Sequence, residues 1–238
     1  PGPQPPPSLN REQRQFLAAV IQPASQDRRQ AGGGPLPLLL WGPPGTGKTT
    51  TLVAAVHALL RSQPGARILV TAPSNPAADL LCERLAALGV AETEMLRLVA
   101  MMREPKYLPQ AVRPYTRSNI ANGGFVVPEL SDLRAQRVVV STCTTAAYIR
   151  SRLSKKERGW FSHVFVDEAA QGLEAEALIP VTLLAEGGKV CFAGDFKQLG
   201  PVIRSPVSIE YGLQTSLMER IVNRISVDHS RVFSLLET

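Results

Sequence analysis

The chain is poor in the residue types that build disulfide frameworks, metal sites and stacking surfaces. Its 238 residues include three cysteines, three histidines and only 5% aromatic residues. Cys82, Cys143 and Cys191 lack the spacing of a zinc site and are odd in number, so neither zinc nor a disulfide framework is indicated. Each cysteine lies in or beside an apolar stretch, which predicts buried thiols in a reducing compartment. The scattered histidines receive no catalytic or metal role.

Long hydrophobic runs are also lacking. No apolar run approaches the ~18 residues that a membrane-spanning helix needs, and the first residues show no secretory signal pattern. We therefore expect a cytoplasmic protein without a membrane partner. A hydrophobic content of 44% is enough for a buried core, which excludes a disordered chain. The formal net charge of +6 favours a polyanionic partner without deciding it.

Short apolar stretches alternate with amphipathic ones from residue 36 onward. Several of the apolar stretches are continuous runs of Val, Ile, Leu and Phe, which is typical of parallel strands covered on both faces by helices. The pattern predicts an α/β fold with a doubly wound, mostly parallel sheet. The predicted strands are Leu36–Trp41, Arg67–Ala72, Met95–Ala100, Arg137–Thr142, His163–Val166 and Lys189–Ala193.

Three segments fall outside this alternation. Residues 1–8 are rich in proline and are interpreted as a linker or an artificial chain end. Residues 101–128 hold four prolines and a Gly-Gly pair, with basic residues interleaved with aromatic ones. This insertion either contacts a single nucleic-acid strand by charge and stacking or simply packs on the domain. The domain itself is expected to span residues 9–230.

A glycine-rich loop carries the strongest functional signal. Residues 42–49 fit G-x-x-x-x-G-K-[ST] between a predicted strand and a predicted helix. Backbone amides of such a loop close around phosphate oxygens, and the helix adds its positive N-terminal end. Lys48 is expected to reach the β- and γ-phosphates of ATP, and the Thr49 hydroxyl to hold Mg²⁺. The predicted nucleotide-binding residues of this segment are Gly42, Pro43, Pro44, Gly45, Thr46, Gly47, Lys48, Thr49 and Thr50.

A second signal is the acid pair that ends the strand His163–Val166. Asp167 is placed to hold Mg²⁺, directly or through water. The adjacent Glu168 is placed to polarise the attacking water as a general base. Hydrolysis of ATP, and not only its storage, follows from Glu168. The pairing predicts that residues 48–49 and 167–168 meet in one pocket.

An ordered set of further motifs narrows the class. Asn10 and Gln13 precede the loop, residues 71–75 follow the second strand, residues 167–171 extend the acid pair, and residues 194–201 close the series. Together they resemble superfamily 1 RNA helicases of the up-frameshift type, and within them the Armitage / Moloney-leukaemia-virus-resistance branch. The resemblance covers residues 9–238 and implies a RecA-like P-loop NTPase domain.

The resemblance also implies roles for two glutamines. In the family, the residue at Gln13 contacts the adenine base, and the residue at Gln198 contacts the γ-phosphate and links hydrolysis to domain movement. The alternative for Gln13 is a capping box with Asn10 that ties down the start of a helix, and both readings can hold together. Lys48, Asp167, Glu168 and Gln198 are thus the predicted catalytic residues.

Two segments after strands are candidates for contact with a nucleic-acid backbone. Pro73, Ser74 and Asn75 precede a predicted helix that Asn75 is expected to cap, and Thr142 and Thr144 repeat the arrangement after the fourth strand. Capping alone would explain these residues. In the family the two segments line the RNA track, which favours backbone contact with single-stranded RNA.

The family pattern includes a second RecA-like domain that supplies arginines to the γ-phosphate. The chain is expected to be the first domain only, with residues 231–238 as the start of the second, and to hydrolyse ATP very slowly by itself. The resemblance also implies proteins of RNA silencing or RNA turnover as partners, in the cytoplasm or its ribonucleoprotein granules. An AAA+ or DNA-directed ATPase and an inert scaffold remain alternatives, whereas a GTPase would need an N-K-x-D stretch that the sequence lacks.

Overall fold

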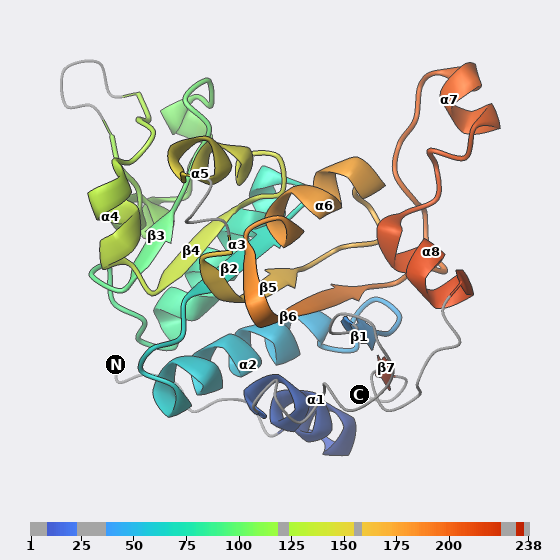
Figure 1. Ribbon diagram of the computed structural model, residues 1–238, viewed down its shortest axis with the longest axis horizontal. Helices are drawn as coiled ribbons and strands as arrows, with labels where there is room; N and C mark the ends of the chain where they lie inside the picture. Colours follow the sequence, from blue (N-terminus) through green and yellow to red (C-terminus); the bar gives the residue numbers. More distant parts are fainter. Residues whose placement is uncertain (1–8, 23–36, 119–123, 155–158, 225–231, 236–238) are drawn as a thin grey trace.

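The sheet is the element that organises the molecule. The computed structural model describes residues 9–22, 37–118, 124–154, 159–224 and 232–235. Within them lies a seven-stranded sheet of order β3-β4-β2-β5-β6-β1-β7, in which every neighbouring pair is parallel (Figure 1). The strands are β1 (Leu38–Trp41), β2 (Ile68–Ala72), β3 (Met95–Arg97), β4 (Val138–Thr142), β5 (Phe161–Val166), β6 (Leu184–Gly194) and β7 (Val232–Ser234).

Helices cover both faces of the sheet, as the sequence predicts. Successive side chains of a strand point to opposite faces of the sheet. In β1, Leu38 and Leu40 therefore lie in one apolar cluster, whereas Leu39 lies in a second cluster on the other face. One cluster is closed by α1 (Arg11–Ile21), α2 (Lys48–Ser62) and α3 (Asn75–Ala87). The other is closed by α4 (Leu130–Ala135), α5 (Ala147–Arg152), α6 (Glu174–Val181) and α8 (Leu217–Arg224).

The end of the domain differs from the prediction. Val232–Ser234 forms β7 and pairs with β1, and Phe233 packs edge-on against Phe16 of α1 with ring centroids 5.4 Å apart. A boundary at residue 230 is therefore corrected, because this short strand belongs to the same sheet as β1. Its three residues gave too weak a pattern to recognise. The predicted linker 1–8, His229 and residues 236–238 lie outside the described residues.

A few buried side chains anchor the described part of the insertion to the domain. The insertion contains two 3₁₀ helices, η2 (Pro105–Tyr107) and η3 (Gln110–Tyr115). Val112 and Phe125 are buried in the core, and the Tyr115 hydroxyl donates to the carbonyl of Val90 at 3.1 Å. The described part of 101–128 thus favours the packing alternative, although Tyr107 stays 64% exposed.

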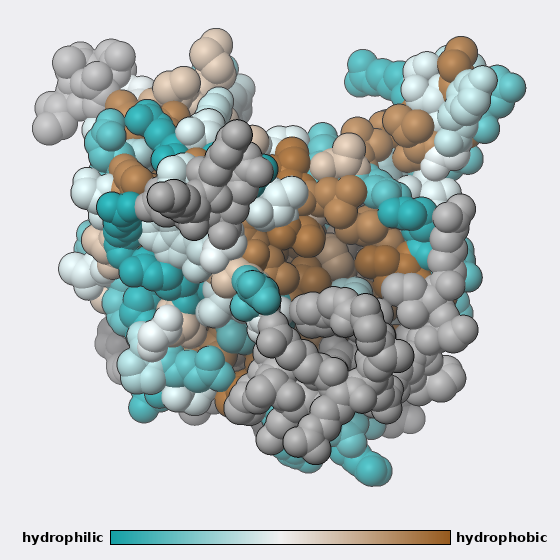
Figure 2. Space-filling model, viewed as in Figure 1, coloured by the Kyte–Doolittle hydropathy of each residue, from teal (hydrophilic) through white to brown (hydrophobic). Residues whose placement is uncertain are grey.

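An arm carrying α7 (Pro206–Glu210) projects from the body beside α8 (Figure 1). Apolar side chains of the arm, including Val207, Tyr211 and Leu213, are exposed. A cavity of about 720 Å³ lies between the arm and α6, and Figure 2 shows hydrophobic surface between the arm and the rest of the molecule. Within the described residues, no helix is long and apolar enough to cross a bilayer.

Candidate functional site

The glycine-rich loop joins β1 to α2 at the carboxyl edge of the sheet. Gly45 and Gly47 have φ of +83° and +82°, which glycine adopts without strain, and Gly47 caps α2. Lys48 is the first residue of that helix. Its buried ammonium donates to the carbonyls of Gly42 and Pro43 at 2.7 and 3.0 Å. The lysine ammonium is therefore bound to the loop whose backbone amides would surround phosphate oxygens.

Gly42 is predicted to tolerate no side chain. A β-carbon there would lie 2.4 Å from the Leu235 carbonyl oxygen and 2.6 Å from Thr46 Oγ1. Because the first of these is backbone, we expect Gly42→Ala to destabilise the chain by about 1–3 kcal/mol in urea unfolding. Gly65→Ala is the matched control, since a β-carbon there meets nothing within 4 Å. Equal stability of the two variants would contradict this prediction.

The acid pair meets the loop from β5. Asp167 is 2% exposed, and its amide donates to the carbonyl of Thr71 on neighbouring β2. Burial raises the pKa of Asp167 to about 6; a hydrogen bond from Thr49 and the charge of Lys48 oppose this rise, and the charge of Glu168 adds to it. These interactions place residues 48–49 and 167–168 together, as predicted. Their catalytic roles stay predictions.

The surroundings of Asp167 suit a divalent cation. Its Oδ1 atom is buried and has no hydrogen-bond partner among the described residues. A carboxylate oxygen beside the Thr49 hydroxyl is the hard oxygen donor set that Mg²⁺ prefers. The residues present therefore fit the predicted metal.

Burial of Asp167 predicts a pH-dependent stability. Because burial raises the pKa of Asp167 from 3.8 to about 6, the chain loses stability as the pH rises from about 4 to about 6, and the full cost is present above that range. Below about pH 4 the group is protonated in both states and costs nothing. Without metal, Asp167→Asn should be more stable than the parent by roughly 2–3 kcal/mol at pH 8, and the gain should vanish towards pH 4. Urea unfolding at both pH values in chelator measures it. Glu210→Gln, an exposed neutralisation, should show no such gain, and a gain of equal size at pH 4 and pH 8 would contradict the prediction.

Glu168 has an unusual backbone. Its φ of +51° is the one positive value at a non-glycine residue in the described part of the chain, and such strain gathers at functional sites. Its carboxylate accepts from Gln171 Nε2 at 2.9 Å. The Glu168 carboxylate is therefore held by Gln171 in the same turn, at an exposed hydrogen bond.

The turn after β6 carries the predicted sensor. Asp195 accepts from Gln198 Nε2 at 2.5 Å, from Trp41 Nε1 at 3.0 Å and from the Lys197 amide at 3.0 Å. Burial alone would raise the pKa of Asp195, but these bonds and the charge of Lys48 outweigh it and hold the pKa below its ordinary value. The predicted sensor turn is thus tied to β1 through Trp41, a contact that was not predicted from the sequence.

Gln13 satisfies the capping-box alternative and also reaches the loop. Its Oε1 accepts from the Asn10 amide at 2.9 Å, and Asn10 Oδ1 accepts from the Gln13 amide at 2.9 Å. A β-carbon on Gly47 would lie 3.1 Å from Gln13 Nε2. The side-chain NH₂ therefore faces the glycine-rich loop while the carbonyl caps α1. Thr50, another of the predicted nucleotide-binding residues, is engaged elsewhere: its hydroxyl accepts from Arg84 Nη1 of α3 at 3.1 Å.

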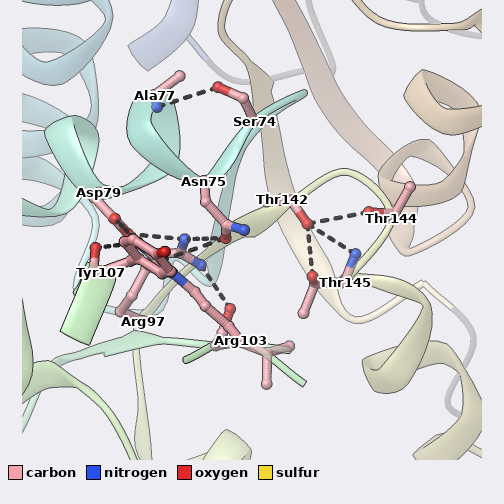
Figure 3. A network of polar contacts seen from close by, with 11 residues as sticks. Ser74, Asn75, Ala77, Asp79, Arg97, Arg103, Tyr107, Thr142, Thr144 and Thr145 are labelled. Atoms are coloured by element: carbon pink, nitrogen blue, oxygen red, sulfur yellow. Dashed lines mark hydrogen bonds and ion pairs between the residues drawn. The ribbon is translucent and has the colours of Figure 1, made fainter. Parts of the chain in front are cut away.

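The two segments predicted to contact nucleic acid lie side by side. Ala72 and Thr142 are register partners in β2 and β4, and the Cys143 amide donates to the Ala72 carbonyl at 2.9 Å. Residues 73–75 and 142–144 thus leave the same edge of the sheet (Figure 3). Ser74 and Thr144 are exposed there.

The capping assignments need correction. Ser74, and not Asn75, caps α3: its backbone is extended and its hydroxyl accepts from the Ala77 amide, whereas Asn75 is already helical. Thr142 caps no helix, because α5 begins at Ala147 without a side-chain cap. It instead closes a turn by accepting from the Thr145 amide at 3.1 Å.

A buried ion network beneath Asn75 was not predicted from the sequence. It joins Asp79 of α3 to Arg97 of β3 and to Arg103 of the insertion. The available signal was Arg97 itself, a charge in the middle of the apolar run Met95–Val99.

The three cysteines, Cys82, Cys143 and Cys191, are buried thiols, as predicted. Burial raises the pKa of Cys82 to about 12 and the pKa of Cys143 to about 11.

Known proteins resemble this chain over most of its length. RNA helicase Mov10l1 of Mus musculus is 40% identical over 220 residues, which cover 92% of this chain and 17% of that protein, and the Homo sapiens protein of the same name gives the same values. The helicase domain of Hef from Pyrococcus furiosus superposes with a TM-score of 0.51 at 18% identity, over 93% of this chain and 36% of that one. This likeness confirms the predicted RecA-like fold.

The chain spans less than a fifth of the length of the Mov10l1 proteins. These relatives confirm the resemblance to the Moloney-leukaemia-virus-resistance branch. Residues 8–124 and 129–206 match the AAA domain family, and the chain belongs to that family.

Proposed function

We propose that this chain is the ATP-binding first motor domain of an ATP-dependent helicase or translocase that acts on single-stranded RNA. One observation carries the proposal: the glycine-rich loop, the acid pair, the sensor turn and the segments after β2 and β4 all lie at the carboxyl edge of one parallel sheet. Ligands of open α/β sheets bind at this edge. A nucleotide and a strand would therefore lie close enough to influence each other.

The predicted site residues would have different roles in binding ATP and Mg²⁺ and in hydrolysis. The loop amides and the N-terminus of α2 would bind the phosphates, with Lys48 exchanging its carbonyl acceptors for phosphate oxygens. Thr49 and Asp167 would hold Mg²⁺, which supplies charge neutralisation on the phosphates. Glu168 would take the proton of the attacking water, and Gln198 would report the γ-phosphate from the Asp195 turn. Gln13 would donate to the adenine from its NH₂.

The preference for RNA rests on relatives whose name is RNA helicase Mov10l1. The need for a second domain rests on chemistry: an arginine finger contributes a factor of ~10³–10⁵ in comparable phosphoryl transfer. The chain alone should thus bind nucleotide weakly and turn it over very slowly. A role in RNA silencing in the cytoplasm stays a prediction.

The deciding experiment measures ATP hydrolysis by the longer protein that contains this chain, with RNA, with DNA and with no polymer. RNA-specific stimulation is the expected result. Stimulation by DNA alone would reassign the substrate, and absence of hydrolysis would favour a scaffold. Brisk RNA-stimulated turnover by the monomeric 238-residue chain would refute the need for a second domain.

A further inference from the structure

A buried charge network lies directly below the first residue of α3 (Figure 3). Asp79 is 3% exposed and accepts from Arg97 Nε at 2.9 Å and from Arg103 Nη1 and Nη2 at 3.0 and 2.5 Å. Arg97 is fully buried, so its charge is tolerable only because it is paired. The network therefore holds both guanidinium groups in fixed positions.

The same guanidinium groups reach Asn75. Its Oδ1 atom accepts from Arg97 Nη2 at 3.0 Å and from Arg103 Nη1 at 3.4 Å. A guanidinium has donors and no acceptor, so only the oxygen of the amide can face it. The orientation of the Asn75 side chain is thus decided by chemistry: its carbonyl points to the arginines and its NH₂ points away from them.

Asn75 is not needed for capping. Ser74 performs that task for α3, and within the described part of the chain nothing accepts from Asn75 Nδ2. The side chain is half-buried beside exposed Ser74, at the edge that also carries Thr142 and Thr144. An oriented donor is therefore presented at the surface proposed to face the strand.

Further bonds fix the two arginines. Arg97 Nη1 donates to the Leu98 carbonyl at 2.7 Å, so each nitrogen of its guanidinium is bound. Arg103 Nη2 donates to the Tyr107 carbonyl of η2 at 2.8 Å. The start of the insertion thereby helps to hold Arg103 in contact with Asp79. Because both guanidinium groups are planar and are fixed by several hydrogen bonds, they have little freedom to move away from Asn75.

We propose that Arg97 and Arg103 are positioning residues that hold Asn75 as a fixed hydrogen-bond donor for the phosphate oxygens of a bound single strand. Phosphate oxygens are acceptors present at every nucleotide, so a donor-only contact suits movement along a strand without reading its sequence. The inference rests on the proposed function and adds an element to it: the contact is neutral and directional, and residues outside the strand path set it.

The test uses the 238-residue chain and fluorescence anisotropy with labelled 12-nucleotide oligouridylate and oligothymidylate. Asn75→Asp keeps an oxygen for both arginines but removes the donor, so the fold should persist while affinity falls about 10-fold or more. Asn75→Ala should lose about 10-fold with an unchanged dependence on salt, because no charge is removed. Binding of Asn75→Asp or Asn75→Ala at the parent's affinity would overturn the inference.

A double-mutant cycle tests the positioning. Arg103→Ala should weaken binding about 5-fold in the parent and have no further effect when Asn75 is already alanine, since the arginine acts through the asparagine. Additive losses would overturn the positioning role, because they would mean that Arg103 contacts the strand itself. Should Arg103→Ala fail to fold in circular dichroism, Arg103→Gln is measured in its place.

Arg61→Ala is the matched control, as it removes one exposed positive charge near the far end of α2. It should bind like the parent. The two failures are distinguishable: a parent chain that binds neither oligonucleotide refutes the nucleic-acid part of the proposed function, and the inference falls with it. If the parent binds and the Asn75 variants bind with the same affinity as the parent, only the inference is refuted.

Discussion

Replacing Lys48 with alanine is expected to abolish measurable binding of ATP with Mg²⁺. The ammonium is buried at the top of the loop and is held by two carbonyls, so it is already positioned for phosphate oxygens. Removing one partner of a desolvated charge pair costs about 2–5 kcal/mol, which corresponds to a loss of about 30- to 5000-fold in affinity. Isothermal titration calorimetry on the 238-residue chain measures it.

Lys106→Ala is the matched control for Lys48→Ala. Lys106 is exposed and pairs with Glu104 in the insertion, so its loss removes the same charge away from the loop. Its ATP affinity should equal that of the parent. If Lys48→Ala bound ATP within threefold of the parent while both variants remained folded, the loop would not be the nucleotide site.

Replacing Glu168 with glutamine should separate binding from hydrolysis. The change keeps size and an oxygen that can accept from Gln171, so ATP affinity should stay within threefold of the parent. It removes the group that takes the proton from water, and a general base contributes about 10²–10⁴-fold to the rate. Single-turnover hydrolysis by the longer protein, with saturating RNA, should fall by that factor.

Glu94→Gln is the control for Glu168→Gln. Glu94 lies before β3, at the amino edge of the sheet, and pairs with Arg137. Its loss should leave the rate unchanged. Normal turnover by Glu168→Gln would assign the base to another residue, and loss of ATP affinity would show that Glu168 takes part in binding.

The sheet and the convergence of the glycine-rich loop with the acid pair could be predicted from the sequence because their signals are local. Continuous apolar runs identified six strands, and parallel strands bring their carboxyl ends to one edge wherever they stand in the chain. The loop after β1 and the acids after β5 therefore had to converge. β7 was missed because its pairing is decided by the edge that β1 offers and not by its own three residues.

The surroundings of Asn75, at the edge proposed to face a strand, were harder to predict because the contacts there are not local. The amide of Asn75 could cap a helix or face a ligand, and only the placement of Arg97 and Arg103 decides between them. Those arginines lie 22 and 28 residues away in the chain. Likewise, the basic residues of the insertion suggested a strand-binding surface, yet Arg103 is committed to Asp79.

The contact between Leu235 and the glycine-rich loop has a thermodynamic consequence. The Leu235 amide donates to the Trp41 carbonyl at 2.7 Å, and its own carbonyl sits against Gly42. A shift of β7 along the sheet would change the contact at Gly42, and we expect it to change the spacing of the loop amides as well. A ligand that prefers one spacing also prefers one placement of β7, and by reciprocity a force that displaces β7 changes the affinity of the loop for its ligand.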